Sequence, residues 1–433
     1  MSSNVKSSTV AITTTCAIAF IIFVFCYLYF LQADLLALSQ FAWSDGQTHY
    51  DRLVGAVLLT VVFFLVHLAV SSITDFPKRV RSLTYFPSLV LLGALTSGHL
   101  EPDGRVTVGW ETLLTVILLL AFVVVARQLN KYRPYETPLE SVTLFSQASW
   151  MNMGIMVAMF CLCCAMGNTD RELHNRLKME RYVSHRQYSK ALLVADKDWE
   201  TDSVMTMMRA YSLSKKGQLG EELFTYPLCG GSRALLPAES RANRLAFSPD
   251  SVLWQHLGAA PGFKIAEVKD FFKLLQKRKM AKPSVDDYLL TAYLLDGDLY
   301  AFAKEIGSYY DMRTDEERKA AHETLEKKRK ALARKIGKEE AKDSIREVLL
   351  TPSGYARKPM SELPKHYREA LVLYTHIHAQ RVLTYHDNVL DADYEDFLSV
   401  CRAKYPSLSA RNAAVRDAYF GTYWYYYEML TSE

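Results

Sequence analysis

The chain has 433 residues, with 51 Lys and Arg, 47 Asp and Glu, and a formal net charge of +4. Its charges are unevenly placed, because only 9 of the basic and 9 of the acidic residues lie within residues 1–167. This split excludes a chain that is water-soluble throughout. It predicts an apolar membrane domain, residues 1–167, followed by a charged soluble domain, residues 168–433.

Five apolar segments of the first domain are predicted to be transmembrane helices, since a bilayer core of about 30 Å needs roughly 20 apolar residues. The first segment is too long and too aromatic for a cleaved signal peptide. The third is the shortest and contains Pro87 and Gly93. If it does not cross, the charged domain moves to the other side of the membrane. The predicted spans are residues 10–32, 53–73, 83–98, 110–129 and 145–166.

Basic residues in the short loops orient these spans, because cytoplasmic loops are enriched in Lys and Arg. With five spans and a cytoplasmic N-terminus, only Arg52 and Arg105 lie outside. The basic residues on the inner side are Lys6, Lys78, Arg79, Arg81, Arg127, Lys131 and Arg133. We therefore predict a multi-pass protein of the cytoplasmic (inner) membrane with an extracytoplasmic C-terminal domain, a placement that excludes nucleic acid as a partner.

Three cysteines, Cys161, Cys163 and Cys164, lie near the end of the fifth segment. A zinc site usually needs ligand pairs at separated positions, whereas cysteine inside a span packs as a small apolar residue. The cluster is therefore interpreted as helix packing at the membrane exit, with palmitoylation and metal binding as alternatives. Cys229 and Cys401 could form one disulfide in an oxidising compartment, although sequence does not show that they are close.

The second domain contains three segments with one layout: an aromatic-bearing helix, a short polar turn and a second amphipathic stretch. They are residues 181–199, 207–227 and 286–310, and Arg186, Gly217 and Gly297 mark their turns. This layout resembles the tetratricopeptide repeat (TPR), whose helix pairs of about 34 residues stack because none buries its apolar face alone. The predicted fold class is all-α, with polytopic transmembrane helices followed by a TPR-like α-solenoid of degenerate repeats. A non-repetitive helical bundle is the alternative.

Two further segments carry a resemblance over the whole chain. Residues 215–227 read KKGQLGEELFTYP, and residues 363–378 read LPKHYREALVLYTHIH. Together with the spans, they are similar to bacterial membrane proteins, mainly of the Bacteroidota, that form a family of unknown function. The resemblance implies an architecture and brings no activity, cofactor or catalytic residue.

A stack of helix pairs exposes an extended groove lined by first helices, and such grooves bind protein segments. We therefore predict a membrane-anchored scaffold that binds protein partners at the cell envelope and contacts membrane lipids. The candidate partner-binding residues are Tyr182, Met207, Arg209, Tyr211, Tyr288 and Tyr293.

The competing hypothesis is a membrane enzyme or transport-associated factor acting on lipid-linked or envelope substrates. His67 lies inside the second span, where ionisable residues are rare and often functional, although a neutral histidine hydrogen-bonded to a neighbouring helix is the favoured interpretation. His99 and Glu101 lie in an outer loop. No P-loop, nucleophile elbow, zincin or Rossmann motif occurs. No catalytic residue, metal ligand or cofactor is therefore predicted.

Three remaining features favour structural interpretations. His376 and His378 are two apart and would point away from each other on a helix, so they would not share a metal ion. The basic run Lys327–Lys338 is predicted to be a solvated helix face, with contact to lipid headgroups or an acidic partner as the alternative. The C-terminal aromatic stretch Tyr419–Tyr427 is predicted to pack as a cap, with a docking surface as the alternative.

Overall fold

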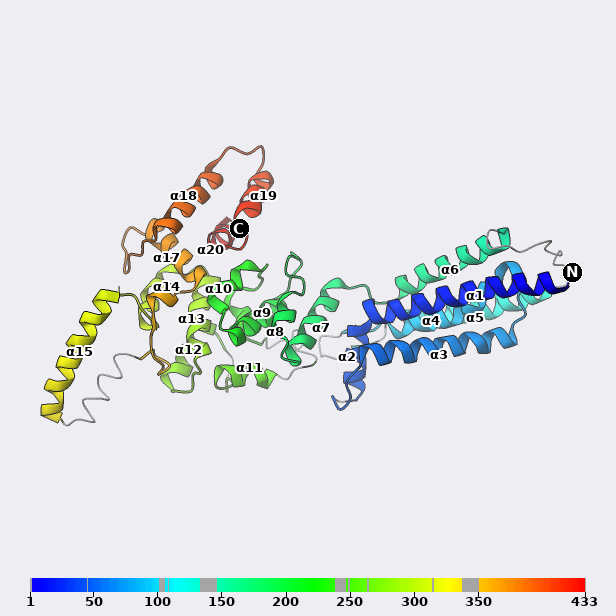
Figure 1. Ribbon diagram of the computed structural model, residues 1–433, viewed down its shortest axis with the longest axis horizontal. Coiled ribbons are helices and arrows are strands. Elements are labelled where there is room, and N and C mark those ends of the chain that lie inside the picture. The colour runs from blue at the N-terminus through cyan, green and yellow to red at the C-terminus, as the bar shows by residue number, and fades with distance from the viewer. Residues whose placement is uncertain are drawn as a thin grey trace. The chain divides into compact units, whose positions relative to one another are not determined.

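The computed structural model describes residues 2–432 except 45, 101–105, 108, 133–145, 238–246, 248–249, 263–264, 314 and 337–349. The backbone alone is described at residues 2–12, 99–100, 106–107, 315, 322 and 328–336. The described chain is mostly helical and divides into two compact units, Met1–Arg181 and Tyr182–Glu433 (Figure 1). Each unit has a buried apolar cluster of its own.

The first unit is a bundle of long helices. A two-stranded antiparallel hairpin, β1 (His99–Leu100) and β2 (Val106–Thr107), follows the fourth α-helix. The helical elements are α1 (Ser2–Cys26), the π-helical turn η1 (Tyr27–Leu31), α2 (Ala33–Trp43), α3 (Arg52–Ile73), the 3-10 segment η2 (Lys78–Tyr85), α4 (Phe86–Leu95), α5 (Glu111–Tyr132), α6 (Gln147–Met166) and α7 (Arg171–Ser184).

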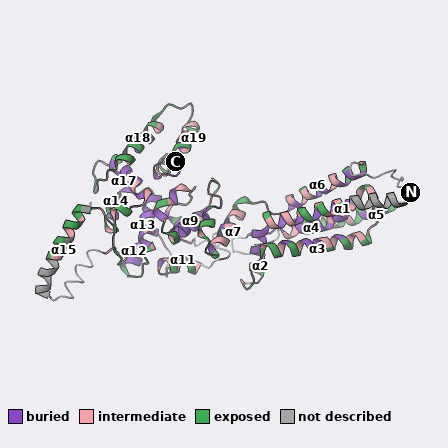
Figure 2. Cartoon of the chain, viewed as in Figure 1, coloured by how far each residue is buried: buried purple, intermediate pink, exposed green. Residues whose placement is uncertain are grey.

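Four helical segments are long and apolar enough to cross a membrane: Thr13–Leu31, Arg52–Ile73, Glu111–Lys131 and Gln147–Met166. They match the first, second, fourth and fifth predicted spans. Exposed residues recur along α3 (Figure 2). Several large apolar side chains of α3 and α5 are more than half exposed, among them Leu58 at 57% and Leu120 at 63%. Such faces are typical of helices that contact lipid rather than water.

The third predicted span contains a shorter helix. α4 has ten residues and rises about 15 Å, half of a bilayer core of about 30 Å. The preceding segment η2 extends this path, although its backbone is non-helical at Val80. The prediction that residues 83–98 cross therefore depends on η2 and α4 together.

Two asparagines hold this path against α6. Near the start of α6, the Asn152 side chain accepts a hydrogen bond from the Ser82 backbone N–H at 2.8 Å and donates to the Lys78 carbonyl at 2.9 Å. Just beyond the end of α6, the Asn168 backbone N–H donates to the Thr96 carbonyl at 2.8 Å. From Asn152 to its last residue, Met166, α6 rises about 21 Å, so η2 and α4 run alongside α6 for most of its length.

The ends of α1, α4 and α6 meet at one end of this bundle. The Tyr27 and Thr96 hydroxyls are 2.9 Å apart, and the Gln32 amide donates to the Asn168 carbonyl at 3.0 Å. The paths of α1, α4 and α6 therefore end together. An up-and-down chain requires this arrangement if α3 and α5 run in the opposite direction.

The second unit consists of short helices around one core. Its only extended pairing among the described residues, apart from one isolated bridge, is parallel and joins β3 (Tyr310–Asp311) to β4 (Lys358–Pro359). The helical elements are α8 (Tyr188–Leu192), α9 (Ser203–Lys216), α10 (Leu219–Glu222), η4 (Leu223–Thr225), η5 (Gly231–Leu235), α11 (Asp250–Leu257), α12 (Val268–Lys277), α13 (Ser284–Leu295), α14 (Leu299–Glu305), η7 (Ile306–Ser308), α15 (Asp315–Ile336), η8 (Met360–Glu362), α17 (Lys365–Ile377), α18 (Asn388–Arg402), α19 (Leu408–Tyr419) and α20 (Tyr423–Ser432).

Two helix pairs of this unit share a turn geometry. Gly217 after α9 and Gly297 after α13 have φ of 71° and 70°, the left-handed conformation in which glycine is favoured after a helix. Two residues later, Leu219 and Leu299 are each 2% exposed. The repeated layout expected from the sequence is present at these turns, but the second helices are short, with four and seven residues.

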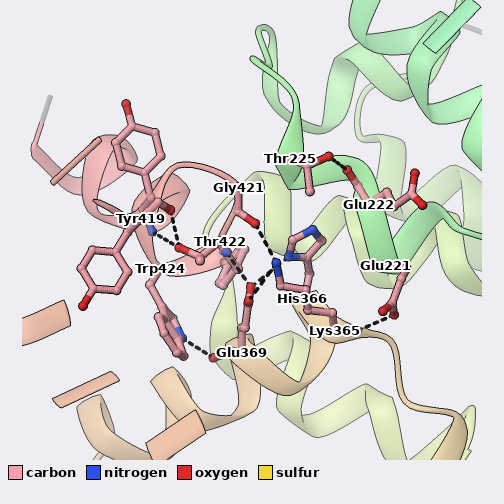
Figure 3. A network of polar contacts seen from close by, with 12 residues as sticks. Glu221, Glu222, Thr225, Lys365, His366, Glu369, Tyr419, Gly421, Thr422 and Trp424 are labelled. Carbon is pink, nitrogen blue, oxygen red and sulfur yellow. Dashed lines mark hydrogen bonds and ion pairs between the residues drawn. The ribbon is translucent and has the colours of Figure 1, made fainter. Parts of the chain in front are cut away.

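The C-terminal helix α20 packs against α17 through a buried polar contact (Figure 3). The Glu369 carboxylate accepts a hydrogen bond from the Tyr423 backbone N–H at 2.7 Å, and the Trp424 indole donates to the Glu369 carbonyl at 2.9 Å. Tyr423 and Trp424 are 0% and 2% exposed. The packing interpretation of the aromatic stretch is confirmed for these two residues.

Of the three cysteines near the end of α6, only Cys163 shows the predicted burial, because Cys164 is half-buried and Cys161 is exposed. Cys163 is buried in the core of the first unit, and α6 ends at Met166. Cys229 is exposed, Cys401 is half-buried, and both are free thiols. Burial raises the pKa of the Cys401 thiol to about 11, with the nearby Glu428 adding to the shift.

Candidate functional site: a basic cavity in the helical unit

The predicted partner-binding residues lie mostly in the core. Tyr182 is half-buried, while the other five are no more than 4% exposed. These five are Met207, Arg209, Tyr211, Tyr288 and Tyr293. They are buried because α9 and α13 are surrounded by other helices rather than forming an open concave face. A partner can therefore reach these side chains only where they line a cavity, as Tyr211 does.

The Arg209 guanidinium has a structural role, because it is held inside the fold by backbone carbonyls. Its guanidinium donates to the carbonyls of Ala195, at 2.8 Å, and Pro227, and to the Thr201 hydroxyl at 3.1 Å. Burial lowers its pKa to about 10, and Tyr226 and nearby aspartates offset only part of this shift. A guanidinium held by backbone carbonyls ties three chain segments together and leaves little for a ligand.

The residues of the enzyme hypothesis are not brought together within the described part of the chain. His67 is buried in the first unit, and its ring stacks on Tyr85 at 3.6 Å between centroids. The backbone of His99 belongs to β1, its side chain lies outside the description, and Glu101 lies outside the described residues. Among the described residues, no group of three or more His, Cys, Asp or Glu is arranged to hold a metal ion.

Near the helix α17, two histidines share one aspartate. His376 and His386 lie 3.0 Å and 3.3 Å from the two carboxylate oxygens of Asp391. Burial would raise the pKa of Asp391, but these hydrogen bonds outweigh it and hold the pKa below its ordinary value. The contact fixes the segment between α17 and α18. His378 takes no part in it and instead packs on Tyr374.

A cavity of about 770 Å³ in the helical unit is lined by basic residues. Arg186, Lys215, Lys282 and His256 face it, together with aromatic and apolar side chains. None of the described residues that line it is an aspartate or glutamate. Within the described chain, Arg186, Lys215 and Lys282 also form no ion pair. The remaining lining residues are Val183, Ser184, Tyr188, Met208, Tyr211, Phe247, Val252, Leu253 and Gln255.

Arg186 reaches the cavity from a strained turn. It follows α7 with a φ of 58°, the same left-handed conformation that Gly217 and Gly297 adopt at the equivalent turns. The Gln187 N–H donates to the Tyr182 carbonyl at 2.8 Å, closing the turn. A non-glycine residue costs roughly 1–2 kcal/mol in this conformation, and such strain is often kept where a side chain has a function.

Lys215 and Lys282 come from two different segments, one at the end of a helix and one just before a helix. Lys215 lies in the last turn of α9, where a cation also favours the helix dipole, and its amine sits 5.2 Å from the centre of the Tyr211 ring. Lys282 precedes α13. The Lys282 N–H donates to the Leu257 carbonyl at 3.1 Å, which joins the start of α13 to the end of α11.

His256 on α11 forms the fourth basic group. Its Nε2 lies 2.8 Å from the Ser214 hydroxyl, and its ring meets the edge of Tyr211 at 5.2 Å between centroids. Burial lowers the pKa of His256 to about 4, and the charges of Lys215 and Lys282 add to the shift. At neutral pH the imidazole is therefore neutral and the cavity carries three cations.

The three cations act on one another through the cavity. Burial lowers the pKa of Lys215, and Lys282 and Arg186 lower it further. Mutual repulsion of cations is relieved when an anion binds among them. Arginine and lysine also donate charge-assisted hydrogen bonds to carboxylate or phosphate oxygens. The arrangement is therefore suited to an anion, and the aromatic walls suit an apolar group attached to it.

Sequence reasoning missed this cavity, because its cations are separated by tens of residues and lie in different segments. One signal was present. Arg186 occupies the turn position at which Gly217 and Gly297 stand in the two other helix pairs. A charged residue in place of glycine marks a position where a side chain is retained despite the backbone cost.

Residues 105–261 match a family of unknown function, DUF6057. The matched region runs from the hairpin before α5 to the end of α11 and includes Arg186, Lys215 and His256, but not Lys282. It agrees with the expectation of an uncharacterised family and carries no activity. Neither the comparison with curated proteins nor the comparison with solved structures gives a match.

Proposed function

We propose that the chain is a membrane-anchored scaffold whose helical unit binds an acidic segment of a partner protein in the basic cavity. The observation that carries this proposal is the convergence of Arg186, Lys215 and Lys282 without a carboxylate among the described lining residues. The volume of about 770 Å³ falls within the range of roughly 300–1,000 Å³ typical of ligand sites. It is large enough for a few side chains of an extended segment.

The scaffold proposal includes a TPR-like arrangement of helix pairs. The matching left-handed turns at Gly217 and Gly297, each followed by a buried leucine, support it. In such a stack, the residues at the turns and helix ends form the accessible rim. Arg186, Lys215 and Lys282 all lie at helix ends, and all three are exposed. Recognition at this rim would depend on charge rather than on the buried tyrosines.

We further propose that the protein lies in the cytoplasmic membrane, with five crossings and an extracytoplasmic helical unit. The parallel course of η2–α4 and α6 supports a third crossing. The inner-loop excess of Lys and Arg supports the orientation. The partner would then be another protein of the cell envelope.

A pair of fusions tests this orientation. Alkaline phosphatase joined after Arg105 or after Glu433 is expected to be active. A fluorescent protein that matures only in the cytoplasm is expected to stay dark at both positions. Fluorescence after Glu433 with phosphatase activity after Arg105 would mean an even number of crossings, and the acidic partner would then have to be cytoplasmic.

Removal of one cavity lysine tests the proposed binding. The probe is a fluorescein-labelled Glu-Glu-Phe-Glu-Glu peptide, titrated into purified full-length protein and followed by fluorescence anisotropy. Lys215→Gln and Lys282→Gln are each expected to raise the Kd about tenfold or more, because each removes a charge-assisted hydrogen bond.

The matched control is Lys216→Gln. Lys216 is exposed, follows Lys215 on the same helix and does not line the cavity. This variant is expected to leave the Kd unchanged. An equal loss in Lys216→Gln would reduce the binding to general charge attraction, and an unchanged Kd in both cavity variants would contradict the proposal.

Binding is also expected to depend on pH through His256. Burial, with the charges of Lys215 and Lys282, lowers its pKa to about 4 in the free protein. A bound carboxylate offsets these charges and raises that pKa, so the complex binds protons more readily than the free protein. Affinity should therefore increase as pH falls from about 6.5 towards 5, above the range in which glutamate itself protonates. His256→Gln should remove this increase. A Kd independent of pH in the wild type would contradict it.

A further inference from the structure

We propose that a second cavity, in the first unit, binds the phosphate group of a membrane phospholipid. This cavity has a volume of about 410 Å³. Its polar wall includes His67, Arg81 and Ser82, and its apolar wall includes Ile18, Ile21 and Leu68. The inference rests on different residues from the proposed binding of an acidic partner segment, and neither depends on the other.

Two polar atoms in the wall are buried without a hydrogen-bond partner in the described chain: His67 Nδ1 and the Ser82 hydroxyl. The two residues are 8% and 2% exposed. A buried polar atom without a partner is costly, and most such atoms in proteins are satisfied by protein or by a bound molecule. Their presence in one cavity wall points to a ligand that supplies the missing partner.

The surrounding contacts fix where these two atoms lie. The His67 ring stacks on Tyr85 with centroids 3.6 Å apart and an interplanar angle of 7°. The Ser82 backbone N–H is already used by Asn152, at 2.8 Å. His67 Nδ1 and the Ser82 hydroxyl remain without a partner in the described chain, while the ring stacking and the hydrogen bond to Asn152 hold the two residues in place.

Arg81 supplies the charge that selects an anion. It is exposed and lines the cavity together with His67 and Tyr85. No aspartate or glutamate is among the described lining residues. A phosphate oxygen accepts hydrogen bonds from a guanidinium in a fork geometry, and from a hydroxyl or a protonated ring nitrogen. The three side chains therefore offer donors that a phosphate requires.

The apolar wall identifies the phosphate as part of a lipid. Ile18, Ile21 and Leu68 are 53%, 40% and 45% exposed, and they belong to two helices that are apolar enough to cross a membrane. The cavity lies near the start of the first span and the end of the second, beside the basic segment η2. This is the depth at which headgroups meet acyl chains, so a phospholipid can place its phosphate at Arg81 and a chain along the isoleucines.

The test measures binding of one defined lipid to the intact protein. Purified full-length protein is delipidated in detergent, titrated with dioleoyl phosphatidylglycerol, and followed by native mass spectrometry. Arg81→Gln is expected to raise the Kd about tenfold or more. Arg79→Gln is the matched control, because Arg79 lies in the same segment, is exposed and does not line the cavity.

A second variant keeps the proposal testable if Arg81→Gln fails to fold. Ser82→Ala removes the unpartnered hydroxyl but keeps the backbone N–H that Asn152 binds, so the fold should be retained. Its Kd is expected to rise about threefold to tenfold. Excess inorganic phosphate should not displace the lipid from the wild type.

Three results would overturn the proposal. Equal losses in Arg81→Gln and Arg79→Gln would indicate general attraction of anionic lipid to a basic segment. Displacement of the lipid by inorganic phosphate would indicate a site for free phosphate. An unchanged Kd in folded Arg81→Gln, or in Ser82→Ala if Arg81→Gln does not fold, would show that these side chains do not contact the headgroup.

Discussion

Replacing Glu369 with alanine is expected to lower the free energy of unfolding of the helical unit by about 3–5 kcal/mol. The carboxylate is 2% exposed, lies 2.9 Å from His366 Nδ1 and accepts the Tyr423 N–H at 2.7 Å. Its removal leaves both groups buried without this partner and loosens the contact of α20 with α17 (Figure 3). Denaturant unfolding of the full-length protein in detergent, followed by tryptophan fluorescence, measures the change.

Two comparison variants separate this contact from a general effect of lost charge. Glu395→Ala removes an exposed glutamate of α18 and is expected to change the free energy of unfolding by less than about 0.5 kcal/mol. Glu369→Gln keeps an acceptor for the Tyr423 N–H and should fall between the wild type and Glu369→Ala. Unfolding of Glu369→Ala at the wild-type midpoint would show that the buried carboxylate does not hold α20.

The second large effect is expected for Arg209→Ala, with a loss of about 3–5 kcal/mol of unfolding free energy. Arg209 is 0% exposed and is the largest of the fully buried side chains in the described chain. Its truncation leaves a cavity and removes the donor from the carbonyls of Ala195 and Pro227. The carbonyls stay buried and lose their donor in the variant. The loss of unfolding free energy should therefore exceed that caused by removing a surface charge. The same denaturant experiment measures it.

Arg209→Lys gives a graded comparison. One ammonium group does not reproduce the planar fork that joins Ala195, Thr201 and Pro227, so an intermediate loss is expected. Lys216→Ala, an exposed change on the same helix, should leave stability within about 0.5 kcal/mol of the wild type. Equal stability of Arg209→Ala and Lys216→Ala would mean that the two carbonyl contacts and the hydroxyl contact of Arg209 contribute nothing measurable.

Much of the membrane unit follows from composition alone. Runs of about 20 apolar residues form helices of crossing length because no other conformation satisfies the backbone in lipid. The third path is different. Its short helix and 3-10 segment run alongside α6 because Asn152 and Asn168 satisfy backbone groups at its two ends. That pairing joins residues about 70 positions apart in the sequence, and no local sequence pattern predicts it.

The burial of the expected binding residues shows that the exposure of a helix position is not predictable from the sequence pattern alone. The segment 203–216 mixes polar and apolar residues, which favours an amphipathic helix with one accessible face. In the structure, Thr206, Arg209 and Ser212 of α9 are 0% exposed, so polar positions are enclosed as well. The apolar pattern predicts which face of the helix is buried. The number of neighbouring helices decides how much of its polar face is covered as well.

Composition and local pattern were enough to predict the division into an apolar and a charged part, the four long spans, the turns at Gly217 and Gly297, and the packing of Tyr423 and Trp424. These features depend on composition, on backbone conformation at single residues and on apolar content, all of which are local. The two cavities were not predictable in this way, because helix packing brings Arg186, Lys215 and Lys282 to one of them and His67, Arg81 and Ser82 to the other. Charges act over distances in space, and the distances between these residues are set by helix packing rather than by their separation along the chain.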